Sequence, residues 1–137
     1  MWAIFALFSA IFAALTSILA KIGMENVNSN LAVALRTIVV LVMAWVLVLV
    51  TGVQDGIGSL SRRNYVFLLL SGMATGLSWL CYFRALQMGP ASKVIPIDKS
   101  SVVFGMILAF IVLKEAFTLK AAIGGSLIAL GTFVLIF

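Results

Sequence analysis

Residues 31–50 have the sequence LAVALRTIVVLVMAWVLVLV, in which Arg36 is the one charged position. A helix of about 20 predominantly apolar residues crosses the hydrocarbon core of a bilayer, which is about 30 Å thick. A segment that is apolar on all sides has no face to offer to water. This stretch therefore predicts a transmembrane helix, and the rest of the chain shows that it is one of several.

Four further apolar runs of similar length flank this segment. They cover residues 2–20, 65–88, 93–113 and 119–137. Residues suited to cap a helix precede four of the five runs, namely Asn30, Ser61, Ser92 and Thr118. The first run lacks the positively charged start of a signal peptide, so we expect a retained helix. The pattern predicts an all-α integral membrane protein, a bundle of five transmembrane helices.

The composition excludes most other classes. Of the 137 residues 64% are hydrophobic and 9% charged, with a mean hydropathy of +1.28, against about 45–50% and about 25% in soluble domains. The chain has no His, and its single Cys, Cys81, lies in an apolar run without a neighbouring base. We therefore expect no enzyme, no catalytic residues, no metal site and no cofactor.

The net charge of +5 does not indicate nucleic acid binding, because that function needs basic residues clustered on one face. The nine basic residues are instead scattered, mostly at the ends of apolar runs, where they anchor helices at the lipid surface. We expect contact with membrane lipids and no contact with nucleic acid.

The basic residues are balanced between the two membrane sides. Five spans place the termini on opposite sides, so the N-terminal side receives Arg62, Arg63, Lys114 and Lys120. The other side receives Lys21, Arg36, Arg84, Lys93 and Lys99. Orientation normally follows a Lys and Arg excess on the cytoplasmic side. Two interpretations stay open: a single local charge difference fixes one orientation, or the chain inserts both ways and forms antiparallel pairs.

Small residues recur at helical spacing in several runs. The first run carries a small stripe beside a row of large side chains, the third contains Gly72 and Gly76 in a GxxxG pattern, and the last repeats small residues every four positions. Small residues let helices approach closely in lipid. We predict helix packing at Ala6, Ser9, Ala13, Gly72, Gly76, Gly105 and Gly125.

Asp98 is a charged residue inside the fourth run, two positions after Pro96. Proline is tolerated in the first turn of a helix, so we expect the regular helix to begin between Ser92 and Pro96. Asp98 would then lie in the first turn and complement the positive end of the helix dipole. Alternatively, it pairs with Arg84 or Arg36, or exchanges a proton or substrate. Both interpretations stay open.

Helical spacing suggests where these polar residues meet. Asp98, Ser101 and Gly105 share one face, whereas Lys99 points about 100° away. Arg36 and Arg84 each lie about 6 Å inside their spans, in the same membrane half. We predict that a net-positive cluster lines or gates the substrate path and favours anionic or zwitterionic solutes. Its members are Arg36, Arg84, Asp98, Lys99 and Ser101.

Two alternatives accompany this cluster. Taken singly, Arg36 and Arg84 suit snorkelling, in which the long side chain reaches the headgroups. Glu115 follows the fourth run at the opposite surface, where it suits an interfacial position. Asp98 and Glu115 are the two candidates for proton coupling.

A family resemblance rests on residues 78–131. The matching features are Trp79, Tyr82, Ala85-Leu86, Gly89-Pro90-Ala91-Ser92, Glu115 and Ile123-Gly124, with Leu35-Arg36 in the second span. The chain resembles the EamA repeat of the drug/metabolite transporter superfamily, and residues 74–79 and 95–99 resemble its stand-alone, single-repeat subgroup. Val102 stands where many fused members have a Pro, so their substrate details do not transfer.

The resemblance implies a single EamA-like transmembrane domain of residues 1–137 that acts as a secondary transporter or exporter of small metabolites. Helices 1 to 4 would line a central site in a bacterial plasma (inner) membrane protein. Fused members carry two repeats of inverted topology, a plan that a single repeat reproduces by pairing with an oppositely inserted copy. We therefore expect an antiparallel homodimer with a small-molecule substrate. The alternative is a non-transporting or lipid-carrier subunit that assists movement of lipid-linked or anionic-headgroup substrates.

Overall fold

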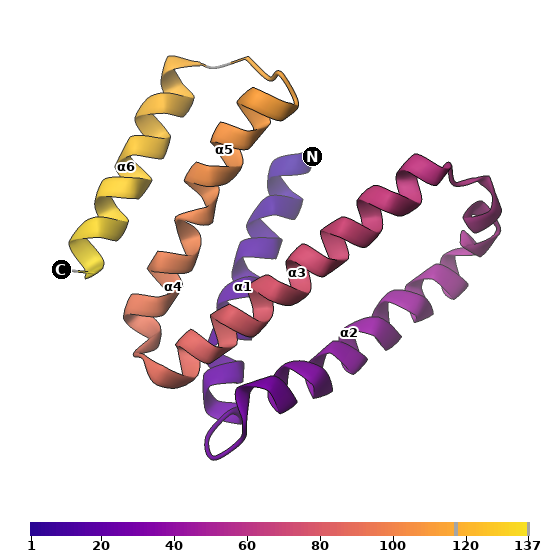
Figure 1. Cartoon of the computed structure of the whole chain (residues 1–137), viewed down its shortest axis with the longest axis horizontal. Helices are drawn as coiled ribbons and strands as arrows, with labels where there is room; N and C mark the ends of the chain where they lie inside the picture. Colours follow the sequence, from indigo (N-terminus) through magenta and orange to yellow (C-terminus); the bar gives the residue numbers. More distant parts are fainter. Residues whose placement is uncertain (117, 137) are drawn as a thin grey trace. The chain divides into compact units, whose positions relative to one another are not determined.

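The computed structural model describes residues 1–116 and 118–136, and this part of the chain contains helices and no strand. Five of its helical segments are long and apolar enough to cross a membrane (Figure 1). They are α1 (Trp2–Gly23), α2 (Ser29–Thr51), α3 (Arg62–Met88), the pair α4 (Ala91–Lys99) and α5 (Ser101–Val112), and α6 (Leu119–Ile136). The short 3-10 helix η1 (Gln54–Ser59) lies between α2 and α3. The predicted all-α membrane fold is confirmed.

The predicted spans agree with these bounds to within three residues at each described end, while Phe137 lies outside the described residues. Two predicted caps are confirmed by their hydrogen bonds. Ser61 Oγ accepts from the Asn64 N–H at 3.2 Å, and Thr118 Oγ1 accepts from the Ala121 N–H at 3.2 Å. Each hydroxyl satisfies a backbone donor that the first turn leaves unpaired.

The other two predicted caps are wrong. Asn28 caps α2, because its side-chain oxygen accepts from the Asn30 N–H at 2.9 Å, so the helix begins at Ser29. At α4 the cap is Pro90 rather than Ser92. The backbone of Pro90 is extended, which the fixed φ of proline allows, and its carbonyl accepts from the N–H groups of Lys93 and Val94. The helix therefore begins at the next residue, Ala91.

The expected position of Asp98 in a first turn is also wrong. Because α4 begins at Ala91, Pro96 lies inside the helix and Asp98 lies in its last turn. The helix is interrupted at Ser100 instead, where the Ser100 N–H bonds to the Ile97 carbonyl at 3.0 Å and the Ser100 hydroxyl bonds to the same oxygen. Asp98 therefore cannot complement the positive end of α4.

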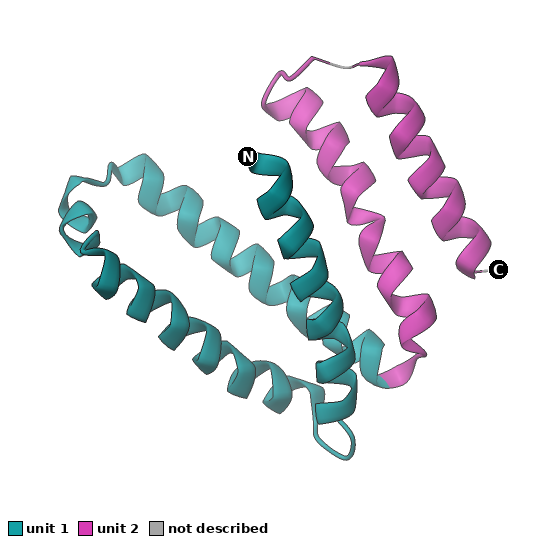
Figure 2. Cartoon of the chain, turned by 180° about the vertical axis from the view of Figure 1, so that it is seen from behind, with its two compact units in different colours: residues 1–87 teal, residues 88–137 magenta. Residues whose placement is uncertain are grey.

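The chain divides into two compact units, residues 1–87 and 88–137 (Figure 2). The first contains α1, α2, η1 and most of α3. Its buried side chains come from the end of α1, the start of α2 and the end of α3, so these three helices pack at one end of the unit. The buried residues there are Ser17, Met24, Ser29, Val33, Phe83 and Leu86.

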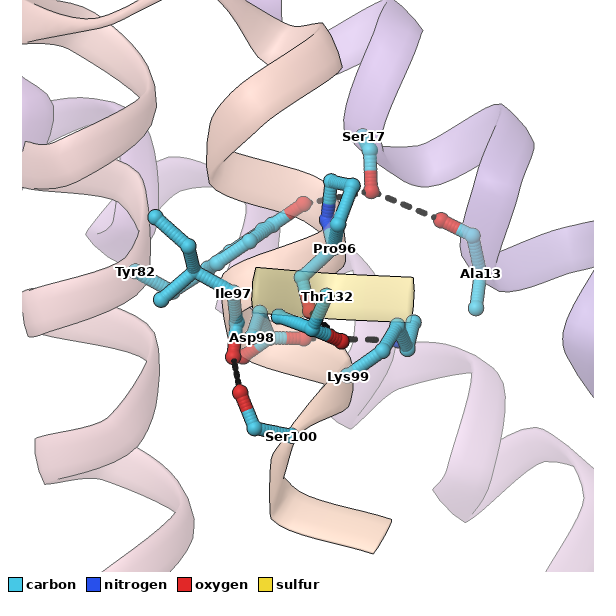
Figure 3. Close-up of polar contacts among 9 residues, drawn as sticks. All are labelled: Ala13, Ser17, Tyr82, Pro96, Ile97, Asp98, Lys99, Ser100 and Thr132. Carbon is cyan, nitrogen blue, oxygen red and sulfur yellow. Dashed lines mark hydrogen bonds and ion pairs between the residues drawn. The ribbon is translucent and has the colours of Figure 1, made fainter. Parts of the chain in front are cut away.

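Polar contacts connect α1 to α3 within this packed end. The Tyr82 hydroxyl donates to Ser17 Oγ at 2.7 Å, and Ser17 Oγ in turn donates to the Ala13 carbonyl at 2.9 Å (Figure 3). Lys21 Nζ donates to the Leu86 carbonyl at 2.5 Å, near the end of α3. A cation is favoured at that end because the last carbonyls carry partial negative charge.

In the second unit α6 runs antiparallel to α4 and α5 (Figure 1). Gly125 is buried there, and a Cβ placed on it would lie 3.5 Å from Cε of Met106 in α5. Thr132 is also buried, and its hydroxyl donates to the Pro96 carbonyl at 3.4 Å (Figure 3). One face of α6 thus packs on α5 through a glycine and on α4 through a hydroxyl.

Candidate substrate site

An open cavity of about 630 Å³ lies between α2 and α3 in the first unit, and most of the residues that line it are exposed. Ligand sites in proteins typically enclose about 300–1,000 Å³, so a small metabolite fits this volume. Its walls consist of residues from the facing sides of the two helices, which are Asn30, Val33, Ala34, Thr37, Val40, Leu41 and Ala44 of α2 and Leu68, Ser71, Gly72, Thr75, Gly76, Trp79 and Leu80 of α3.

The cavity walls are apolar apart from a few oxygen-bearing side chains. The Thr37 hydroxyl donates to the Val33 carbonyl at 2.7 Å and the Thr75 hydroxyl donates to the Ser71 carbonyl at 2.9 Å. Each hydroxyl hydrogen is therefore used inside its own helix, while its oxygen keeps acceptor capacity for a ligand. Apolar walls with a few placed polar groups are typical of small-molecule sites.

The predicted packing glycines Gly72 and Gly76 lie in this cavity wall. A Cβ placed on either would meet no described atom within 4 Å, and the same holds for Gly105 of α5. These glycines leave space open within the chain. Of the predicted packing residues in α1, Ala13 is partly buried, whereas Ala6 and Ser9 are exposed.

Arg36 is not one of the residues that line the cavity, but it lies on the same helix α2 and faces two aromatic rings of α3. Its guanidinium carbon lies 4.3 Å from the ring centroid of Phe83 and 5.0 Å from that of Trp79. Both distances are within the range of cation–π attraction, which contributes about 0.5–2 kcal/mol. Trp79 also lines the cavity, so one ring contacts both the guanidinium and the open space.

The Arg36 guanidinium keeps an unpaired donor. Its Nη1 atom is buried and has no hydrogen-bond partner among the described residues. A guanidinium has five N–H donors, and a buried donor without an acceptor costs about 1–3 kcal/mol. The cation–π contacts stabilise the charge but supply no acceptor in the guanidinium plane.

The other predicted cluster residues have partners of their own. Arg84 is exposed and its Nη1 donates to Gln87 Oε1 at 3.1 Å. Asp98 Oδ2 forms an ion pair with Lys99 Nζ at 3.3 Å near the end of α4 (Figure 3). Ser101 is exposed at the start of α5.

Arg36 and Arg84 belong to the first unit, whereas Asp98, Lys99 and Ser101 belong to the second. Their convergence into one cluster stays a prediction. Glu115 follows α5 and is exposed, with its backbone N–H bonded to the Ala109 carbonyl at 3.3 Å. This position outside the helix agrees with an interfacial residue, and proton coupling through Glu115 stays a prediction as well.

Sequence reasoning missed the cavity and the aromatic partners of Arg36. A signal was present in α3, where Ser71, Thr75 and Trp79 follow at four-residue steps and therefore share one helix face. Gly72 and Gly76 lie beside that face, and their small size is what leaves the space open.

Comparisons with known proteins match the chain to a transporter family and to a relative that is described as a transporter. The model of the EamA-like transporter family matches residues 1–137, which covers both units. The chain is 42% identical over 134 residues to a protein of Sinorhizobium sp described as an uncharacterized transporter in the cobO 3'region, covering 98% of this chain and 95% of that protein. No solved structure matched the chain.

Proposed function

The chain belongs to the EamA-like transporter family, and from this premise we propose that it is a secondary transporter or exporter of small metabolites in a bacterial plasma membrane. It is a multi-pass membrane protein with five helices, among the described residues, that can cross a bilayer. A transporter rather than an enzyme is the class that its family supports. The finer proposal concerns substrate, site and assembly.

The cavity between α2 and α3 carries this proposal. Polar groups inside membrane spans are costly and usually face a cavity or a substrate path. Here Asn30, Thr37, Ser71 and Thr75 all contribute to the wall of one cavity whose volume suits a metabolite. Arg36, which faces a ring of the cavity wall, is the residue we place first in the substrate path, with Arg84, Asp98, Lys99 and Ser101 as further members.

We also propose that the protein works as an antiparallel homodimer with alternating access. The support is the balance of basic residues between the two sides, together with the match of residues 1–137 to the family, since an oppositely inserted copy of these five helices would reproduce an inverted-repeat plan. The exposed small residues Ala6 and Ser9 of α1, together with Gly105 of α5, provide close-approach surfaces for another helix.

A lipid-carrier or non-transporting subunit is the second candidate. It is favoured by the basic residues at the ends of the spans, since such residues bind anionic headgroups. Transport of a water-soluble compound by the purified protein separates the two candidates.

The test is a counterflow assay in proteoliposomes with a panel of labelled water-soluble metabolites. We expect saturable counterflow for at least one compound. Gly76→Leu should reduce it strongly, because a Cβ at this position has open space around it and the added side chain would narrow the cavity. Gly124→Leu is the matched control, since Gly124 also has open space around it but lies in α6, outside the cavity.

Movement of a labelled lipid with no counterflow of any soluble compound would favour the lipid carrier. Absence of both activities in folded protein would favour the non-transporting subunit. Equal activity of the two glycine variants would place the substrate path elsewhere.

A further inference from the structure

We infer that Arg36 binds the anionic group of the ligand, a carboxylate or phosphate attached to an apolar body, which it holds beside the α2–α3 cavity. This inference rests on the proposed function, because it names the substrate class of the same site. A free organic anion and an anionic lipid headgroup share this chemistry. Three observations support the inference: the charges of the surrounding helices, the position of Arg36 along α2, and the hydrogen bonding of its guanidinium.

The charge argument concerns the helices of the first unit. The segments α1, α2 and α3 contain basic residues and no Asp or Glu. A charge inside a membrane span usually pairs with an opposite charge or a backbone carbonyl. The carboxylate expected to balance the cluster, Asp98, is instead paired with Lys99 in the second unit. The two carboxylates of the first unit, Glu25 and Asp55, lie outside these three helices, so Arg36 has no carboxylate within the spans of its own unit. An anionic ligand would supply the counter-charge.

The depth of the guanidinium argues against snorkelling. Because α2 begins at Ser29, Arg36 lies about 10 Å inside the span rather than the 6 Å expected from the sequence. Its head group lies over Phe83 and Trp79, positions about 8 and 14 Å from the end of α3. The side chain therefore extends across to α3, whereas a snorkelling arginine would extend along α2 toward the headgroups.

The hydrogen bonding shows which ligand groups fit. The guanidinium carbon lies within cation–π distance of two rings, and its Nη1 is buried without a hydrogen-bond partner among the described residues. Carboxylate and phosphate oxygens are the acceptors that match this planar fork. The neighbouring walls at Val33, Val40 and Leu80 are apolar. An apolar body attached to the anionic group would lie against them.

The test uses Trp79 as a reporter, because it contacts Arg36 and lines the cavity. Trp2→Phe and Trp45→Phe leave Trp79 as the one tryptophan of the chain. This protein, reconstituted in phosphatidylcholine vesicles, is titrated with benzoate, benzyl alcohol and benzylammonium. We expect a saturable change in Trp79 fluorescence with benzoate and none with the other two. Equal responses to the three compounds would overturn the inference, and this experiment leaves Arg36 unsubstituted.

Two arginine variants locate the effect. Arg36→Gln should weaken benzoate binding about tenfold or more, as expected for the loss of a charged hydrogen-bond donor. Arg63→Gln is the matched control, because Arg63 also stacks on a ring, that of Phe67 at 5.8 Å, but lies at the exposed start of α3. It should bind benzoate as before. Unchanged binding by folded Arg36→Gln protein would also overturn the inference.

The same titration in vesicles that contain phosphatidylglycerol distinguishes a lipid headgroup from a soluble organic anion as the ligand. If phosphatidylglycerol in the vesicles shifts Trp79 emission and competes with benzoate in a manner that needs Arg36, the ligand is a headgroup. If phosphatidylglycerol has no effect while benzoate binds, the ligand is a soluble anion. No response to either overturns the inference.

The inference and the proposed function fail in different ways. Counterflow of neutral or cationic compounds without benzoate binding would keep the transporter and remove the anion site. Benzoate binding that depends on Arg36, without counterflow of any compound, would keep the anion site and remove the transporter.

Discussion

At the scale of single residues, two charges inside the spans have different surroundings. Asp98 is paired with Lys99 and 32% of its side chain is exposed, whereas Arg36 contacts two rings and keeps a buried donor unpaired. An ion pair between partly exposed groups contributes about 0–1 kcal/mol. This ion pair therefore contributes little to the free energy of unfolding, and a role of Asp98 in proton coupling stays a prediction.

We predict that Asp98→Asn impairs transport and abolishes proton coupling while folded protein is still recovered. The change keeps the shape and removes the charge that a coupled proton would bind. The measurement is counterflow and proton-driven uptake in proteoliposomes, beside thermal unfolding in detergent. Normal transport with reduced thermal stability would show that Asp98 has a structural role only.

Glu115→Gln is the companion experiment. Because Glu115 lies outside the helices, we expect a smaller loss of transport than with Asp98→Asn. Strong inhibition by this change alone would place the essential carboxylate at the opposite surface.

Tyr82→Phe tests the contact between α1 and α3. It removes the hydroxyl that donates to Ser17 Oγ at 2.7 Å, and should lower the free energy of unfolding by about 0.5–1.5 kcal/mol. Tyr65→Phe is the control, because the Tyr65 hydroxyl donates to the Ile57 carbonyl at an exposed site, where water can replace it. Denaturant unfolding in detergent should separate the two variants; equal losses would contradict a specific role for the α1–α3 contact.

At the scale of elements, the second unit depends on close packing of α5 and α6. Gly125 is buried against Met106, whereas neighbouring Gly124 has open space. Small residues at such positions allow the van der Waals contact that holds helices together in lipid. The four-residue repeat of small residues in the last span thus has a partner inside the chain.

We predict that Gly125→Leu destabilises the protein by about 1–3 kcal/mol, because the added atoms overpack the contact with Met106 and separate α5 from α6. Gly124→Leu should change stability much less, since its side chain enters open space. Thermal unfolding in detergent and the yield of monodisperse protein measure the difference. Similar unfolding temperatures for the two variants would contradict this packing.

At the scale of the whole molecule, the prediction concerns the orientation in which the chain inserts into the membrane. The five candidate spans of the described residues would place the two ends of this segment on opposite sides, with no clear excess of basic residues on either side. Large apolar side chains remain exposed along the spans, as lipid or a second copy requires. Dual insertion would supply the inverted partner for a single repeat.

Reporters fused to the C-terminus should therefore show both cytoplasmic and outside populations. Two or three added Lys on one side should reduce these to a single population, since Lys is retained on the cytoplasmic side. One fixed location of the unmodified C-terminus would exclude the antiparallel homodimer and leave a parallel oligomer or an unrelated partner.

The amino-acid sequence alone was sufficient to establish the fold class and the spans. Continuous apolar runs of about 20 residues specify membrane helices locally, because every backbone group of a helix is paired within its own segment. Caps such as Ser61 and Thr118 were predictable for the same reason, since each bonds to a residue three positions away. The family resemblance also came from local motifs. That residues 1–137 act as a single domain stays a prediction.

The site depended on contacts between helices, which no local pattern specifies. The predicted cluster of Arg36 with Asp98 stays a prediction, whereas the folded chain shows contacts that the sequence did not predict, of Arg36 with Trp79 and Phe83. Likewise, the same four-residue spacing of small residues left space at Gly72 and Gly76 and gave close packing at Gly125. The physical reason is that a side chain's partner and the space around a glycine are set by the rotation and separation of neighbouring helices, which depend on contacts between residues far apart in the chain.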